Sequence, residues 1–168
     1  KECRKIVRET LKKYNLTELW SRDIPVKTEE LGEKAKATAP RQIQKFIAKP
    51  NHLTAKEFEQ ELYLVRKEID ILTTDHSYKD FYIPSFSSHS IVYKGLFVGD
   101  DIKNYYLDLQ DEDYVSDFVV FHQRFSTNTF PKWSLAQPFR VMAHNGEINT
   151  VRANRHWMKA RSKADQPL

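Results

Sequence analysis

The sequence predicts one domain of mixed helices and strands, either α/β or α+β. Apolar residues recur at helical spacing in some stretches, while other stretches alternate or run continuously apolar as strands do. The chain has 168 residues, of which 40% are hydrophobic and 12% aromatic, enough for one packed core. No apolar run approaches the roughly 20 residues that span a bilayer. Collagen-like, low-complexity, wholly disordered and membrane-spanning chains are therefore excluded.

The first 50 residues predict two helices and two strands. Cys3, Val7, Leu11 and Tyr14 recur at helical spacing and give the opening helix one apolar face. Prolines interrupt the pattern, because a proline disfavours helical and strand geometry around it. In order, the elements are a helix over 3–14 closed by Asn15, a strand over 17–24, a helix over 31–37 and a strand over 41–48.

The clearest element is a long helix that begins after Thr54. Thr54 and Glu57 form a capping box, in which each side chain binds the other residue's free backbone N–H. Apolar residues then recur at four-three-four-three spacing, at Phe58, Leu62, Val65, Ile69 and Leu72. Because this stripe lasts only two heptads, we expect it to pack in the core rather than form a coiled coil.

From Asp80 onward the pattern changes mainly to strands. The predicted elements are strands over 81–93, 118–125 and 139–143, a short helix over 98–107, an acidic loop over 108–113 and a basic helix over 149–162. The apolar start of the 118–125 stretch is typical of a buried central strand. We expect Val151, Trp157 and Met158 to reach the core, and Trp133 and Trp157 to anchor the loop and helix that contain them.

Charge and cysteine content narrow the functional classes. The net charge of +4 is mild and mixed, whereas nucleic-acid binders of this size concentrate a basic face. A nucleic-acid-binding fragment stays as an alternative. Its candidate contact residues are Arg152, Arg155, Lys159, Arg161 and Lys163, although a solvated helix face explains these charges more simply. The single cysteine excludes an internal disulfide and a Cys-ligated zinc or iron–sulfur site, and favours a reducing, cytoplasmic setting. Because no initiator methionine is present, we expect an excised piece of a longer protein.

A polar segment, residues 122–129, follows the predicted central strand, and strand ends are where sites are commonly built. Arg124 presents a planar fork suited to a carboxylate or a phosphate. Ser126 and Thr127 add hydroxyl groups close by. From composition alone, an ion pair between Arg124 and a nearby acid is the commoner role.

A second polar segment, His144-Asn-Gly-Glu, lies where the last predicted strand passes into a helix. The side-chain amide of Asn145 and the backbone N–H of Gly146 can both donate to one point, as in an oxyanion hole. The alternative is an Asn-Gly turn, which is commoner. His122 and His144 have no apparent third metal ligand, so we expect them to pack and hydrogen-bond.

Three stretches together carry a family resemblance. FHQRFSTNTFPKWSLAQPFRVMAHNGEINTVRANRHWM, residues 121–158, closely resembles the glutaminase domain of glutamate synthase large subunits. YKGLF at 93–97 and WSRDIPV at 20–26 are similar to the same domain. The resemblance implies a class II glutamine amidotransferase with the N-terminal-nucleophile (Ntn) hydrolase αββα sandwich. It also implies that residues 1–168 are a single partial domain, without the nucleophile strands and the C-terminal remainder.

The resemblance implies a role for each candidate residue. It favours these roles over the ion pair of Arg124 and the Asn-Gly turn, which were the commoner alternatives from residue type alone. Arg124 resembles the arginine that holds the substrate carboxylate, and Thr127 would support the substrate beside it. Asn145 and Gly146 resemble the oxyanion donors. The implied substrate is glutamine, whose released ammonia serves glutamate formation from 2-oxoglutarate.

The nucleophile of this family is an amino-terminal cysteine, whose own α-amino group acts as the base. Here residue one is Lys1, and Cys3 is internal to the opening helix, on its apolar stripe. A thiol buried there is expected to be unreactive. We therefore expect this chain alone to be inactive.

The resemblance also implies partners outside this chain. FMN and an iron–sulfur cluster belong to other domains of the parent enzyme, with an electron-donor subunit or ferredoxin as a further partner. For the chain itself we expect no cofactor, metal, nucleic acid or membrane. A non-catalytic Ntn-fold module for binding or regulation stays as the alternative, and the residues upstream of Lys1 would discriminate the two.

Overall fold

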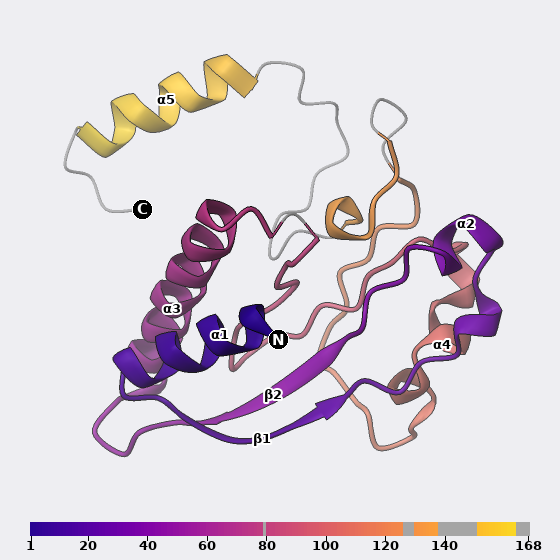
Figure 1. Ribbon diagram of the computed structural model, residues 1–168, viewed down its shortest axis with the longest axis horizontal. Helices are drawn as coiled ribbons and strands as arrows, with labels where there is room; N and C mark the ends of the chain where they lie inside the picture. Colours follow the sequence, from indigo (N-terminus) through magenta and orange to yellow (C-terminus); the bar gives the residue numbers. More distant parts are fainter. Residues whose placement is uncertain (79, 126–129, 138–150, 164–168) are drawn as a thin grey trace.

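The structure is a computed structural model, and it describes residues 1–78, 80–125, 130–137 and 151–163. Its longer elements are helices α1 (Glu2–Lys13), α3 (Ala55–Asp75) and α5 (Val151–Lys163) and strands β1 (Thr17–Asp23) and β2 (Ile43–Ala48). Its short helical segments are η1 (Thr28–Glu30), α2 (Glu33–Lys36), η2 (Gly99–Asp101), α4 (Ile102–Tyr105), η3 (Leu107–Gln110) and η4 (Trp133–Leu135). The described chain is therefore mixed α+β with an antiparallel sheet (Figure 1).

Helix α1 confirms the opening prediction. It buries Val7, Thr10 and Leu11 on one face, while Cys3 is half-buried rather than buried. Asn15 closes the helix with a φ of 55°, a left-handed conformation that asparagine tolerates better than most residues. The chain can therefore reverse directly into strand β1.

Strands β1 and β2 form an antiparallel pair whose register runs from Thr17 opposite Ala48 to Asp23 opposite Ile43. A register shift between Glu18 and Trp20 interrupts the ladder. Beside it, the rings of Trp20 and Phe46 stack with centroids 4.0 Å apart. Both predicted strands of the first half are thus confirmed, and they pair with each other.

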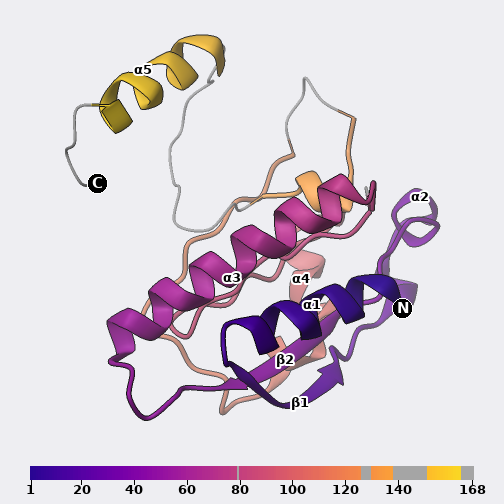
Figure 2. The ribbon, with the colours of Figure 1, turned by 60° about the vertical axis from the view of Figure 1, so that its left-hand side comes forward.

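Helix α3 lies beside α1 against the sheet (Figure 2). Its capping box is present, with the Thr54 backbone N–H donating to Glu57 at 2.8 Å and the Glu57 N–H donating to the Thr54 hydroxyl at 3.2 Å. The buried stripe follows the predicted spacing at Phe58, Leu62, Val65 and Ile69. It ends at Thr73 instead of Leu72, which is only half-buried. The stripe packs against α1, which confirms a core helix.

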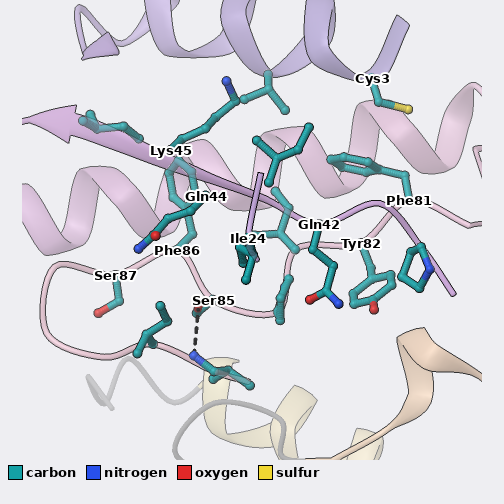
Figure 3. A pocket seen from close by; sticks show the side chains of 18 of the residues that line it. Cys3, Ile24, Gln42, Gln44, Lys45, Phe81, Tyr82, Ser85, Phe86 and Ser87 are labelled. Carbon is teal, nitrogen blue, oxygen red and sulfur yellow. Dashed lines mark hydrogen bonds between the residues drawn. The ribbon is translucent and has the colours of Figure 1, made fainter. Parts of the chain in front are cut away.

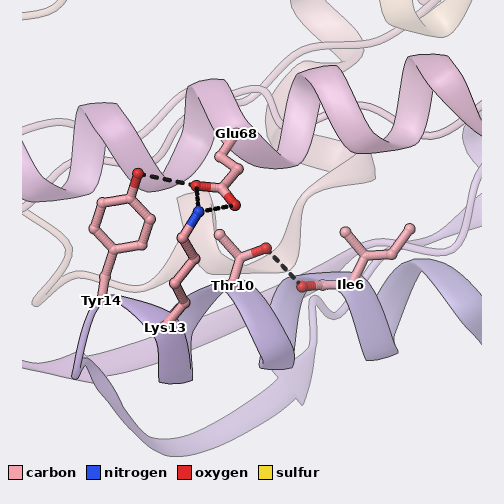
Figure 4. A network of polar contacts seen from close by, with 5 residues as sticks. All are labelled: Ile6, Thr10, Lys13, Tyr14 and Glu68. Atoms are coloured by element: carbon pink, nitrogen blue, oxygen red, sulfur yellow. Dashed lines mark hydrogen bonds and ion pairs between the residues drawn. The ribbon is translucent and has the colours of Figure 1, made fainter.

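An ion pair joins the same two helices at the far end of α1 (Figure 4). The ammonium of Lys13 lies 2.7 and 2.8 Å from the two carboxylate oxygens of Glu68, and the Tyr14 hydroxyl donates to the same carboxylate at 3.0 Å. The bond from Lys13 lowers the pKa of Glu68. This exposed ion pair therefore adds a polar link between two helices that are packed mainly through their apolar faces.

A second core is largely aromatic and lies beside α2 and α4. Leu31, Tyr105, Tyr106 and Trp133 are buried there. The rings of Tyr105 and Tyr106 meet edge to face with centroids 4.7 Å apart, a favoured geometry for aromatic pairs. This core brings together parts of the chain that are far apart in sequence.

The predictions for the second half were only partly right. The helices over 98–107 and 149–162 are confirmed in substance by η2, α4 and α5. The strands over 81–93 and 118–125 are wrong, because both stretches are irregular and no described strand lies beside them to complete a hydrogen-bonded ladder. The 118–125 stretch is also mostly exposed rather than buried, with Phe121 81% accessible. The strand predicted over 139–143 lies outside the described residues.

The C-terminal helix has the predicted type but not the predicted burial. Val151, Trp157 and Met158 are exposed, so the expectation that they reach the core is wrong, as is the anchoring role of Trp157. In the structure, α5 has no described neighbour that could bury an apolar stripe. The anchoring role of Trp133 is confirmed, since this ring is buried and its Nε1 donates to the Ala35 carbonyl at 3.1 Å.

Candidate functional site

Of the predicted substrate-site residues, the structure describes Arg124. Its side chain is exposed. Thr127, Asn145 and Gly146 lie outside the described residues, as do Ser126 and His144. Whether these side chains converge on one point therefore stays a prediction. His122 is exposed, so the expectation that it packs is wrong, because the strand that would have buried it does not form.

The segment that leads to Arg124 passes close to the short helix η2. The Gln123 side chain lies so close to Gly99 that a Cβ on this glycine would be 2.6 Å from its Cγ. Glycine permits this approach because it has no side chain. Arg124 therefore directly follows a residue whose side chain lies close to η2.

The three stretches that carry the family resemblance meet around the aromatic core. Arg22, from WSRDIPV, donates from its two terminal nitrogens to Asp108 at 3.0 and 2.6 Å. Tyr93, from YKGLF, donates its hydroxyl to the same carboxylate at 3.0 Å. Burial, followed by a hydrogen bond with Tyr114, raises the pKa of Tyr93, so its hydroxyl remains a donor. Asp108 is thus the common acceptor for two motifs more than 60 residues apart (93 − 22 = 71).

Lys94, also in YKGLF, connects this scaffold to the third stretch. Its side chain is buried, at 5% exposure. Its ammonium donates to the carbonyls of Ser134 and Ala136, each at 2.8 Å, and lies 5.1 Å from the centre of the Tyr82 ring. Burial, and then the positive charge of Arg66, lowers the pKa of Lys94 to about 8. Sequence reasoning missed this residue, although a lone lysine within IVYKGLF, an otherwise largely apolar run, was a visible signal.

A cavity of about 520 Å³ lies between α1, strand β2 and the irregular stretch 80–93 (Figure 3). Its volume falls within the range of small-molecule sites. The wall is mainly apolar and includes Ile24, Phe81 and Phe86, and it also includes Cys3 and Gln42. Gln42 is already committed to the aromatic core, since it donates to Tyr105 at 3.0 Å and accepts from Tyr106 at 2.7 Å. Among the described residues, Arg124 is not part of the wall of this cavity.

The described part of the chain bears on metal binding, membrane insertion and nucleic-acid binding. Its His, Cys, Asp and Glu residues form no cluster of three or more that could hold a metal ion. Within the same residues, each helix is too short or too polar to cross a bilayer. Helix α5 exposes its basic residues, but it exposes Val151, Trp157 and Met158 as well, so its surface is not a purely basic face.

Comparison with known proteins agrees with the motifs. A family model described as glutamine amidotransferases class-II matches residues 1–166. The large chain of the NADPH glutamate synthase of Azospirillum brasilense is 44% identical over 158 residues, which are 94% of this chain and 10% of that protein. The ferredoxin-dependent glutamate synthase of Antithamnion sp. is 46% identical over 163 residues (95% and 10%), and the chloroplastic enzyme of Spinacia oleracea 37% over 166 (98% and 10%). The chain thus spans about a tenth of the length of these relatives.

Proposed function

Since the chain belongs to the class-II glutamine amidotransferases, we propose that it forms part of the glutamine-hydrolysing domain of a glutamate synthase. One observation carries the proposal: nearly the whole chain, 94% to 98% of it, aligns with glutamate synthases at 37% to 46% identity. The proposed fold is the Ntn αββα sandwich, of which residues 1–168 form an internal portion.

In the proposed reaction a cysteine thiolate attacks the side-chain amide carbon of glutamine. The C–N bond breaks, the leaving –NH2 group takes up the proton that the α-amino base removed from the thiol and departs as ammonia, and water then hydrolyses the thioester to glutamate and the free thiol. Cys3 cannot act as this nucleophile, because its nitrogen belongs to a peptide bond within α1 and cannot serve as the base. The nucleophile is therefore proposed to come from outside these 168 residues, and the chain alone to be inactive.

The proposed substrate contacts divide binding from catalysis. Arg124 makes two parallel bonds to the α-carboxylate of glutamine, and Thr127 supports the substrate beside it. The Asn145 amide and the Gly146 N–H donate to the oxyanion of the tetrahedral intermediate. The exposed position of Arg124, next to the contact between Gln123 and Gly99, supports its role, since a ligand can reach it.

The later steps are proposed for other domains of the parent enzyme. FMN and an iron–sulfur cluster would supply the redox chemistry there, with NADPH or ferredoxin as electron source, as the names of the relatives indicate. The residues of this chain do not fit the cluster, because a single cysteine cannot provide its several thiolate ligands. What this chain contributes is recognition of glutamine and stabilisation of the oxyanion.

Arg124→Lys in the complete parent synthase tests the proposal. A point charge then replaces a fork, and we expect apparent glutamine binding to weaken by about 2–3 kcal/mol, the scale of a charge-assisted contact. Synthesis driven by free ammonia bypasses the site and should be nearly unchanged. Arg41→Lys is the matched control, because Arg41 is exposed and pairs with Asp23.

Equal loss of both activities would show that Arg124 stabilises the fold rather than binding the substrate. A complete parent without any glutaminase activity would instead favour a non-catalytic module for binding or regulation.

A further inference from the structure

The reaction proposed above makes no use of the cavity of about 520 Å³ between α1, strand β2 and residues 80–93 (Figure 3). Apolar side chains from all three elements meet in its wall, among them Val7 from α1, Ile43 from β2 and Phe81 from the irregular stretch. An apolar ligand that enters removes such surface from water, which is favourable. The cavity therefore suits a small molecule with an apolar body.

The irregular stretch that forms one side of the cavity is fixed by hydrogen bonds. Within the stretch, the Val92 backbone N–H donates to the Ser85 hydroxyl at 3.2 Å (Figure 3). Ser88 donates from its backbone N–H and from its hydroxyl to the Glu59 carboxylate of α3, at 2.9 and 2.7 Å. The wall is therefore preformed, as it usually is in small-molecule sites.

Most of the polar side chains at the centre of the wall already bind other residues of the chain. The Gln44 amide oxygen accepts from Arg22 at 2.8 Å, and Gln42 is committed to the aromatic core. The Lys45 ammonium lies 2.7 Å from the Glu18 carboxylate. A ligand rich in amide groups, such as glutamine, would therefore lose its hydrogen bonds to water without gaining equivalent ones in the cavity.

Positive charge exceeds negative charge at the edge of the cavity. Two arginines of the wall, Arg4 and Arg41, act on one carboxylate, that of Asp23. Both oxygens of Asp23 already accept from Arg41, each at 2.7 Å. The other charged residues of the described wall outside these pairs, Lys1 and Asp80, are equal in number and opposite in sign. Arg4 is therefore the guanidinium that can bind a further anion.

We propose that this cavity binds a medium-chain fatty acid, with the hydrocarbon chain against the apolar wall and the carboxylate on Arg4. The Arg4 guanidinium can donate two parallel bonds to a carboxylate. Its side chain is exposed, so the carboxylate stays partly hydrated while the chain is buried. A long-chain amine would be repelled by the same charge, and an alcohol would gain little from it. This inference does not rest on the proposed function.

A photoreactive decanoate with a diazirine in its chain tests the proposal in the complete parent protein. After irradiation and proteolysis, mass spectrometry should find the label on peptides from α1 and from residues 80–93. Excess decanoate should abolish this labelling. Decan-1-ol and decylamine have the same chain without the negative charge, and they should compete about tenfold more weakly, the scale of a charge-assisted bond. Labelling confined to other peptides, or equal competition by the alcohol, overturns the inference.

Arg4→Gln should raise the concentration of decanoate that halves the labelling by about fivefold or more, because the carboxylate loses its charged partner. The matched control is Arg8→Gln, which changes the same residue type on an exposed position of α1 outside the cavity wall. It should stay within about twofold of wild type. Equal effects of the two variants would contradict the role of Arg4 and overturn the inference.

Ile91→Trp should abolish the labelling by filling the cavity, since Ile91 lines it and is 41% exposed, so that a larger ring can be accommodated without repacking the core. Val98→Trp, at a position that is 70% exposed and outside the wall, is the control.

Cys3 provides a readout that needs no variant, because its half-buried thiol is part of the wall. Decanoate should slow alkylation of this thiol by covering it. An unchanged rate at a decanoate concentration that abolishes the labelling overturns the inference.

Discussion

Gly95 and Trp133 lie so close together that a Cβ on the glycine would be 2.6 Å from Cζ3 of the indole. It would also collide with the ring of Phe97. Both obstacles are parts of rings packed in the aromatic core, so neither can move away cheaply. The glycine of YKGLF is therefore a packing requirement.

Gly95→Ala should destabilise the 168-residue chain by about 1–3 kcal/mol, the usual cost of overpacking a filled core. Thermal unfolding followed by circular dichroism measures the change. Gly32→Ala is the control, because nothing lies within 4 Å of the Cβ it would add. Equal melting temperatures for the two variants would contradict the close approach.

Asp108→Asn should cost roughly 2–3 kcal/mol of folding free energy, because it leaves the Arg22 guanidinium without its two-bonded anionic partner. The Asp108 side chain is only 9% exposed, so water cannot take over the interactions that Arg22 loses with the negative charge. Asp23→Asn makes the same chemical change in an exposed pair with Arg41 and should cost less than about 1 kcal/mol. Denaturant unfolding of both variants provides the comparison, and similar losses would argue against Asp108 as the central acceptor.

Asn145→Ala in the complete parent should lower glutaminase kcat by roughly 10²–10³, the usual cost of one oxyanion donor. The KM for glutamine should change far less, since Arg124 still holds the carboxylate. Asn145→Asp should be at least as harmful, because it sets a negative charge against the one being formed. Steady-state kinetics with a melting curve for each variant test this. A melting point lowered by several degrees with kcat preserved would leave Asn145 as a turn residue.

Lys94 should make folding stability depend on pH in the alkaline range. Burial lowers its pKa from 10.5 to about 8 in the folded chain, so the unfolded chain holds the proton more tightly. Between these values the unfolded state binds more protons, and the free energy of unfolding contributed by this group rises with pH. The neighbouring Tyr82, with a pKa raised to about 12 by burial, stays largely protonated across this window.

The measurement is the difference in unfolding free energy between wild type and Lys94→Met from pH 7 to 11. The wild type should gain stability relative to the variant between about pH 8 and 10.5. A constant difference would mean that Lys94 keeps its ordinary pKa when folded.

Helices were predicted well from the sequence because their signals are local. The Thr54–Glu57 capping box and the apolar stripe behind it lie within one element, and both are present as expected. Strand pairing depends on residues far away in the chain. The stretches 81–93 and 118–125 have strand-like composition, yet neither has a strand beside it in the described structure.

The same distinction applies to the site. Arg124, Thr127, Asn145 and Gly146 were proposed from their residue types together with the family resemblance of their motifs, and their roles stay a prediction. The importance of Lys94 and Asp108 depends on partners that are far away in the sequence. Lys94 binds Ser134, 40 positions away, and Asp108 binds Arg22, 86 positions away. No local pattern encodes such partners, so only the folded structure identified them.

The exposed residues of the 118–125 stretch have a practical consequence for handling this polypeptide. Phe118, Val119 and Phe121 each present more than 70% of their surface to water, and Phe130 presents 89%. Such a surface favours contact between molecules, and short apolar runs rich in valine and phenylalanine are prone to intermolecular β-pairing. Turbidity should therefore increase with protein concentration and with ammonium sulfate, which strengthens apolar association. Val119→Lys, which places a charge in the middle of the run, should raise the concentration at which turbidity begins.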